Sequence, residues 1–252
     1  MKKVFLPLLA LLFLGGMLRA QTLDEVLAKY YQARGGLEKL RAVKARKMSG
    51  KILLTAQGLE MRMVIWQKHP DKMRVETLFQ DKKIIQAFDG RKTWWIMPFL
   101  SEDAQEMPPE QGRQFRDQAE FEDPLLVYKA KGYPLELLGE EELRGTPVFK
   151  LKLTKANGKV IYFYLDAGSG IELESSWSMK AGESETRIEI LYGNYRPVDG
   201  ILMPLAIVNK VDGKIQVQMA LEAIEMNPAL EDALFAMPEK KESPKPTSGG
   251  RP

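Results

Sequence analysis

The sequence predicts a mainly β protein of the α+β class, built around one long antiparallel sheet. Three observations lead to this prediction. Hydrophobic residues alternate with polar ones along much of the chain from Lys47 onward, which is the period of a half-buried strand. Turn-forming pairs such as Asp-Gly and Asn-Gly separate these stretches at short intervals. Helical patterns are confined to the N-terminal region and to one insertion between strands.

The N-terminal region predicts a helix that begins after Thr22. The Thr22 hydroxyl and the Glu25 carboxylate have the spacing of a capping box, which satisfies amides of the first turn. Gly35-Gly36 ends this helix, and a second short helix is expected over 37–43. The apolar residues at helical spacing are Leu23, Val26, Leu27, Tyr30 and Tyr31.

The turn signals divide the rest of the chain into about twelve strands with short connections, which is an antiparallel meander. A sheet of that length must curl or close, and its concave apolar face can hold a ligand or a plugging helix. The expected strands are 47–57, 59–68, 72–80, 83–89, 92–98, 134–143, 146–154, 159–166, 171–180, 184–195, 201–211 and 214–226.

The meander is interrupted by a segment that predicts two helical pieces, the insertion 101–132. Pro108-Pro109 can open the first piece because the first turn of a helix does not need those amides. The second piece covers 124–131. We therefore expect one domain over 21–237, followed by a Pro-rich tail, 238–252, with the composition of a disordered segment.

The first twenty residues have the pattern of a secretory signal peptide. Lys2 and Lys3 precede an apolar stretch that is shorter than a membrane span, and Ala20 offers a cleavage site. No cysteine follows, so we expect no lipid anchor there and a soluble periplasmic protein. The net charge of +3 comes from the signal peptide, because its removal leaves 34 basic residues against 34 acidic ones.

The composition argues against most catalytic chemistry. The chain has no cysteine, and its single histidine, His69, lies in a predicted turn, which we interpret as a surface position. No phosphate loop or nucleophile elbow is present. We expect no enzyme activity, no metal, no cofactor and no nucleic-acid partner. Chemistry by carboxylates alone stays open, since sequence does not show which acids meet in space.

Charge is uneven along the predicted mature chain. Residues 34–51 contain seven bases and one acid, whereas residues 101–124 contain eight acids and two bases. The basic block can meet anionic headgroups or an acidic partner, and the acidic insertion can act as a lid that pairs with it. Two solvated faces would give the same pattern.

Several tryptophans and methionines lie in or beside the predicted strands, where they can form a core or line an apolar cavity. Methionine suits surfaces that accept varied apolar shapes. The aromatic residues concerned are Trp66, Trp94, Trp95, Phe99 and Trp177, and the methionines are Met61, Met63, Met73, Met97 and Met107.

Three segments in order along the chain resemble one known family. They are the turn Gln67–Arg74, the run from Asp89-Gly90 through Trp94 or Trp95 to Met97-Pro98-Phe99, and the strand pair Tyr195–Pro204. The helical insertion directly follows the second segment. This order and spacing resemble the periplasmic lipoprotein carriers, the LolA/LolB-like group of outer-membrane lipoprotein-sorting proteins.

The resemblance implies an incomplete antiparallel β-barrel of about eleven strands wrapped around a helical lid, with an N-terminal helix. Members of this family hold the acyl chains of lipoproteins in an apolar cavity, without a cofactor or covalent chemistry. An arginine links the barrel to the lid in the carriers, and Arg34, Arg41 and Arg46 are the positional candidates here.

From these observations we expect a soluble, monomeric periplasmic carrier of lipoprotein or lipid acyl chains, which exchanges cargo with membrane-bound donor and acceptor proteins. The alternative is a sensor or interaction protein that recognises a lipoprotein or a partner protein with the same curved sheet. The candidate ligand-binding residues are Met63, Trp66, Trp94, Met97 and Phe99 on strands, with Phe115, Leu125, Leu126 and Tyr128 on the lid.

Overall fold

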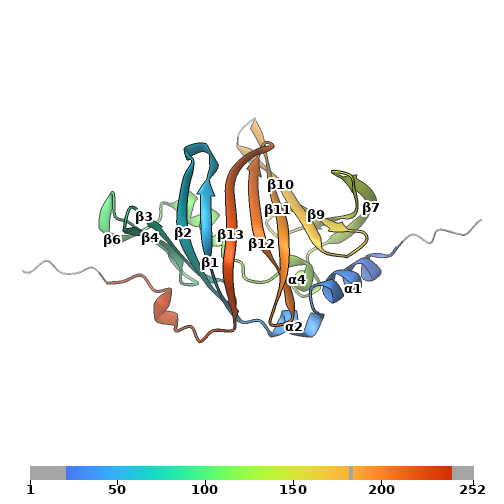
Figure 1. Ribbon diagram of the computed structural model, residues 1–252, viewed down its shortest axis with the longest axis horizontal. Coiled ribbons are helices and arrows are strands. Elements are labelled where there is room, and N and C mark those ends of the chain that lie inside the picture. Colours follow the sequence, from blue (N-terminus) through green and yellow to red (C-terminus); the bar gives the residue numbers. More distant parts are fainter. Residues whose placement is uncertain (1–20, 182–183, 240–252) are drawn as a thin grey trace, which may run out of the picture.

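The computed structural model describes residues 21–181 and 184–239, which form one antiparallel sheet of thirteen strands with α-helices packed on it (Figure 1). The predicted signal peptide and most of the predicted Pro-rich tail lie outside the described residues. Among the residues that are described, no helix combines the length and the hydropathy needed to cross a bilayer.

The sheet is ordered β6-β5-β4-β3-β2-β1-β13-β12-β11-β10-β9-β8-β7. Hairpin connections account for this order everywhere except at β1 and β13, which are distant in sequence and pair antiparallel. The strands are β1 (Ala45–Leu54), β2 (Leu59–Lys68), β3 (Lys72–Phe79), β4 (Lys82–Phe88), β5 (Thr93–Met97), β6 (Ser101–Glu106), β7 (Leu135–Leu143), β8 (Thr146–Thr154), β9 (Val160–Asp166), β10 (Glu172–Ala181), β11 (Ser184–Val198), β12 (Ile201–Val211) and β13 (Lys214–Met226).

Strand β6 is a correction to the sequence-based expectation, which placed Ser101–Glu106 in the helical insertion. It brings the sheet to thirteen strands, where the turn signals predicted about twelve strands and the family resemblance implied about eleven. The segment Ser-Glu-Asp-Ala-Gln-Glu has no apolar alternation, and its side chains are exposed or half-buried. It forms a strand because it pairs with β5 at the edge of the sheet, where neither face needs to be fully buried. Hydrophobic periodicity gives no signal for such a strand.

The two edges of the sheet, β6 and β7, are consecutive strands in the chain. The barrel is therefore incomplete, and the segment between Glu106 and Leu135 must cross from one edge to the other. That segment contains α3 (Pro109–Gln118) and α4 (Pro124–Lys131). In Figure 1, β1, β13 and β12 stand nearest the viewer and α4 lies behind the sheet. The topology thus places both helices across the concave face.

The helix ends follow from local chemistry. The predicted capping box of Thr22 and Glu25 begins α1 (Leu23–Ala33), and α2 (Leu37–Ala42) follows the glycine pair. Helix α4 begins where the Asp123 carboxylate accepts a hydrogen bond from the Leu125 amide. Helix α3 approaches the sheet closely at Gly112, where an added Cβ would lie 2.5 Å from Oγ1 of Thr93.

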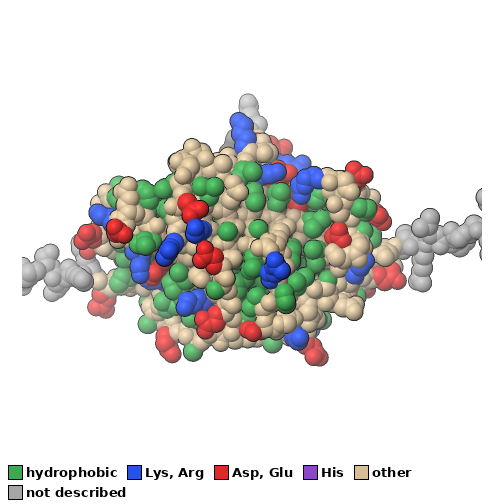
Figure 2. All heavy atoms as spheres, in the orientation of Figure 1, with side chains coloured by type: hydrophobic (Ala, Val, Ile, Leu, Met, Phe, Trp, Pro, Cys, Tyr) green, Lys and Arg blue, Asp and Glu red, His purple; other side chains and the backbone are tan. Residues whose placement is uncertain are grey.

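Strand register identifies the two faces of the sheet. Residues paired across neighbouring strands share a face of the sheet. Such pairs connect every strand from β2 to β9. Ile65 of β2 packs against the cluster of α3, and Phe163 of β9, on the same face, packs against α1 and α4. This face is the inner face. The opposite, outer face is the one turned toward the viewer in Figure 2, where charged side chains of both signs lie among hydrophobic ones.

The C-terminal segment after β13 lies on the outer face of β2 to β5. The Trp94 indole donates a hydrogen bond of 2.8 Å to the carbonyl oxygen of Phe235, which is fully buried. Asp232 forms ion pairs of 2.7 Å with both Lys68 and Lys72. The segment, with its short 3-10 helix η2 (Asp232–Leu234), therefore covers one wing of the sheet from outside.

Candidate functional site

Helix α3 covers the inner face of β2 to β5. Phe115 is 6 % exposed and packs with Met73, Phe88 and Met107 in one apolar cluster, to which Trp95 contributes from β5. Burying a phenylalanine side chain contributes about 1.5–3 kcal/mol, so this contact holds α3 on the sheet.

Helix α4 covers the other wing of the inner face together with α1. Leu125 and Tyr128 of α4 pack with Val26 and Tyr30 of α1 in a second cluster. The strand residues of that cluster are Phe149, Leu151, Leu153, Ile161, Phe163 and Leu165. Both ends of the insertion are thus anchored by packing, one on each wing.

Between the two wings, the middle strands present apolar side chains on the inner face that are only half-buried. We call this surface the apolar strip. It consists of Met48, Ile52, Leu54, Ile188, Ile190, Ile207, Val217 and Met219. Helices α3 and α4 pack on the wings, so the strip keeps accessible area that a long apolar chain could bury.

A pocket of about 390 Å³ lies between α2, α4 and the adjoining ends of β1, β12 and β13. We call it the cationic pocket. Its apolar lining includes Leu126, Val127, Ile201, Met203 and Met226. Its charged lining consists of Arg34, Arg41, Lys44 and Arg46 against Glu122 and Asp123, and His69 also contributes.

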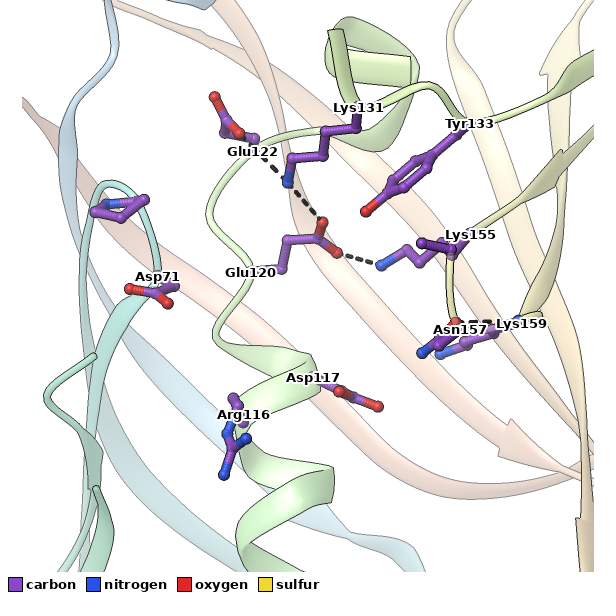
Figure 3. A pocket seen from close by; sticks show the side chains of 12 residues that line it. Asp71, Arg116, Asp117, Glu120, Glu122, Lys131, Tyr133, Lys155, Asn157 and Lys159 are labelled. Carbon is purple, nitrogen blue, oxygen red and sulfur yellow. Dashed lines mark hydrogen bonds and ion pairs between the residues drawn. The ribbon is translucent and has the colours of Figure 1, made fainter. Parts of the chain in front are cut away.

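A second pocket, of about 430 Å³, lies on the other side of the segment that joins α3 to α4 (Figure 3). We call it the balanced pocket, because four basic side chains face four acidic ones. The basic residues are Arg116, Lys131, Lys155 and Lys159, and the acidic ones are Asp71, Asp117, Glu120 and Glu122.

Glu120 connects the elements around the balanced pocket. Its carboxylate accepts hydrogen bonds from Lys155 at the end of the β8–β9 hairpin and, at 3.0 Å, from Lys131 of α4 (Figure 3). Burial alone would raise the pKa of Glu120, but these two lysines lower it below the ordinary value. The joining segment is therefore fastened to β8–β9 by ion pairs.

Two arginines of the basic block hold the joining segment on its other side. Arg46 projects from β1 and donates a 3.3 Å hydrogen bond to the carbonyl oxygen of Phe121, over whose ring its guanidinium lies. Arg34 of α1 lies 3.7 Å from Asp123. The expectation that the acidic insertion pairs with the basic block is met at Asp123, whereas Glu120 pairs with lysines outside that block.

Two buried acids lie on β10, but they do not share a site. Glu174 faces outward and pairs with Arg144 at 2.6 Å. Glu172 faces inward, and burial, together with the charge of Asp123, raises the pKa of its carboxyl to about 8. Because the two side chains point to opposite faces, they form no acid–base pair, and the described residues contain no cluster that could hold a metal.

No family model matches the sequence, and no curated protein matches it. Solved structures do match. An outer membrane lipoprotein-sorting protein domain from Vibrio parahaemolyticus aligns with a TM-score of 0.57 at 14% identity, over 84% of this chain and 94% of that one. A LolA superfamily protein from Nitrosomonas europaea aligns with a TM-score of 0.57 at 14% identity, over 86% and 98%.

A DUF1329 family protein from Desulfovibrio piger aligns with a TM-score of 0.57 at 12% identity, over 82% of this chain and 95% of that one. The protein has a LolA-like fold. At these identities the likeness concerns the fold, and the expected incomplete β-barrel with few helices is confirmed.

The LolA-like fold distributes the predicted binding residues over three places. Met63 and Met97 lie on the inner face, and Met63 is 2 % exposed. The four lid residues lie on α3 and α4: Phe115, Leu125 and Tyr128 pack into the clusters beneath these helices, and Leu126 lines the cationic pocket. Phe99 is 49 % exposed in the turn after β5, against the ring of Phe79.

Trp66 and Trp94 are corrections, because the structure places both on the outer face. Trp66 pairs with Arg74, and Trp94 pairs with Ala87 and lies under the C-terminal segment. The inner-face tryptophan of β5 is its neighbour Trp95. Adjacent residues of a regular strand face opposite sides of the sheet, and the sequence alone did not show which of the two tryptophans faces inward.

Of the three candidate arginines, Arg46 is the one that links a barrel strand of the LolA-like fold to the lid. Arg34 reaches the lid from α1 instead, and Arg41 is exposed on α2. Burial, together with the nearby positive charge of Arg34, lowers the pKa of the Arg46 guanidinium to about 10, so it stays protonated at neutral pH.

Proposed function

We propose that this protein is a non-enzymatic, soluble periplasmic carrier that binds acyl chains of lipoproteins or other lipids on the inner face of the sheet. The observation behind the proposal is the apolar strip, which is half-buried between two anchored helices instead of being filled by them. Each acyl methylene removed from water contributes about 0.8 kcal/mol, so a strip of this size supports binding without a covalent step.

In this proposal, opening of the lid releases the bound acyl chain. Its middle, the joining segment, is held by hydrogen bonds and ion pairs at Arg46, Arg34 and Glu120, while its two helices are held by packing. Polar contacts of this kind rearrange at lower cost than a packed cluster. Exchange with membrane-bound donor and acceptor proteins would therefore act on the joining segment.

The test uses two substitutions on one strand. Ile207→Asp puts a charge into the apolar strip, and its neighbour Val208→Asp puts the same charge on the outer face. Delipidated protein of residues 21–252 is titrated with the neutral apolar fluorophore N-phenyl-1-naphthylamine, which is then displaced by an acylated peptide. We expect Ile207→Asp to weaken binding at least tenfold and Val208→Asp to leave it within about twofold.

Wild-type protein that binds neither probe would refute the carrier proposal. Equal losses of binding affinity in Ile207→Asp and Val208→Asp would mean that the binding site does not lie on the inner face. Mass spectrometry of protein purified from the periplasm gives an independent measurement, since a carrier is expected to retain lipid or lipoprotein. A bound protein segment without acyl chains would favour the sensor or interaction protein.

A further inference from the structure

We propose that the cationic pocket binds the anionic group, a carboxylate or a phosphate, at the polar end of an amphiphile whose acyl chain lies on the apolar strip. This inference rests on the proposed function and names the class of ligand more narrowly. Four basic side chains line the pocket against two carboxylates, so its charges do not balance.

The two carboxylates of the cationic pocket already have partners. Glu122 lies 3.4 Å from Lys131 and 3.3 Å from His69. Asp123 accepts hydrogen bonds from the Tyr30 hydroxyl and the first turn of α4, and it lies near Arg34.

The remaining basic side chains lack such partners. Within residues 21–181 and 184–239, no carboxylate lies within 4.0 Å of the charged nitrogens of Arg41, Lys44 or Arg46. Arg41 and Lys44 are exposed at the rim, so water solvates them. Arg46 is the least exposed of the three, and its guanidinium contacts Phe121 and Gln67.

Arg46 has hydrogen-bonding capacity left for a ligand. Its Nε donates to the Gln67 amide oxygen at 2.6 Å and its Nη2 donates to the Phe121 carbonyl oxygen, both of which are neutral acceptors. A guanidinium taken out of water is destabilised when the counter-charge near it is too small. Burial and the charge of Arg34 lower the pKa of Arg46, and the carboxylate of Asp123 offsets only part of that effect. An anion in the pocket would supply the missing counter-charge and accept from the guanidinium.

The pocket and the apolar strip share strands β1 and β12 of the inner face. Met203 on its wall is two inner-face positions from Ile207 on β12, and Arg46 is followed on the inner face of β1 by Met48. A volume of about 390 Å³ suits a head group but not a head group with a long chain. The chain would therefore continue onto the strip.

The experiment compares ligands with the same twelve-carbon tail. Dodecanoate, dodecyl phosphate and the neutral dodecanol displace N-phenyl-1-naphthylamine from wild-type protein at pH 8 and low salt. We expect the two anions to bind about tenfold more tightly than the alcohol. We expect Arg46→Gln to remove that preference, so that the ratio of anion affinity to alcohol affinity falls to about one, whatever its effect on the affinity for the alcohol itself. Arg62→Gln, on the exposed outer face of β2, makes the same charge change as a control and should keep the preference.

The double variant Arg41→Gln/Lys44→Gln gives a second readout that does not depend on a buried residue. We expect it to reduce the anion preference about two- to threefold, since exposed charges contribute less, and added salt should reproduce that reduction in wild type. Acetate and inorganic phosphate alone should not displace the fluorophore; displacement by them at similar concentrations would mean a site for free anions and would overturn the proposal.

The outcomes separate the two proposals. If anions and alcohol bind equally, and neither the Arg46 variant nor the double variant changes their ratio, the head-group site is refuted and the carrier function stands. If none of the three amphiphiles binds, the carrier function itself fails. If Arg46→Gln does not fold, the double variant and the salt dependence decide.

Discussion

The two pockets lie on either side of the same joining segment, share Glu122 and have similar volumes, yet their charges are arranged differently. In the balanced pocket, Glu120 is paired with two lysines and the acids equal the bases in number. In the cationic pocket, bases outnumber acids four to two. On one side of the segment the acidic and basic side chains are equal in number and Glu120 is paired within the chain. On the other side positive charge is in excess, and the described residues supply no ion-pair partner for Arg41, Lys44 or Arg46.

The largest effect should come from the apolar anchor of α3, the helix that precedes the joining segment. Phe115→Ala removes the side chain that holds α3 against β3 to β5, and we expect a loss of about 3–5 kcal/mol in the free energy of unfolding. Urea denaturation measures it, with the half-exposed Phe99→Ala as the control, expected to cost less than about 1 kcal/mol. Similar losses in both variants would mean that packing does not anchor the lid.

Glu172 provides a pH test on the side of the cationic pocket. Its folded-state pKa of about 8 lies above the ordinary value of 4.5, so the folded protein binds more protons than the unfolded chain between these values. Stability should therefore fall as pH rises from 4.5 to 8, by up to about 1.4 kcal/mol per pH unit from this group.

Glu172→Gln should remove that slope and make the protein more stable than wild type at pH 8. Thermal unfolding at a series of pH values measures the difference between the two proteins. The same pH profile in both would show that Glu172 is not a buried carboxyl held protonated. Once ionised, the Glu172 carboxylate would also offset part of the excess positive charge near Arg34, on the side of the cationic pocket.

The smallest effect concerns the balanced pocket. Glu120→Gln leaves Lys131 and Lys155 without their shared carboxylate, and we expect it to cost about 1–2 kcal/mol of stability at pH 7. The lowered pKa of Glu120 means that this contribution is present above about pH 4.5 and disappears as the pH falls through the folded-state value. The control is Glu110→Gln, whose pair with Arg113 is exposed on α3, and it should leave stability unchanged within the error of the measurement.

Much of the fold followed from local signals in the sequence. The capping box at Thr22 and Glu25, the hairpin turns at Asp199-Gly200 and Asp212-Gly213, and the strand periods were all recognisable, because each depends on neighbouring residues. Strand β6 was not, since its pairing with β5 rather than its own pattern makes it a strand.

The site was harder to predict because it depends on distant residues. Arg46, Phe121 and Met226 line one pocket although they are spread over most of the chain. Whether Trp94 or Trp95 points inward depends on the register of the whole sheet. The raised pKa of Glu172 depends on its burial and on the charge of Asp123, which is distant in sequence. None of these is encoded in the spacing of residues along the sequence.

The position of β6 and β7 at opposite edges of the sheet has a mechanical consequence. The lid is tied to both edges, so it cannot swing away on a single hinge like a door. In the proposed carrier, an acyl chain that pushed α3 and α4 outward would pull on β6 and β7 at the same time, and the curvature of the sheet would have to change. If the proposal holds, ligand binding would place tension on the whole sheet, including its central strand β13 and the pairing of β13 with β1.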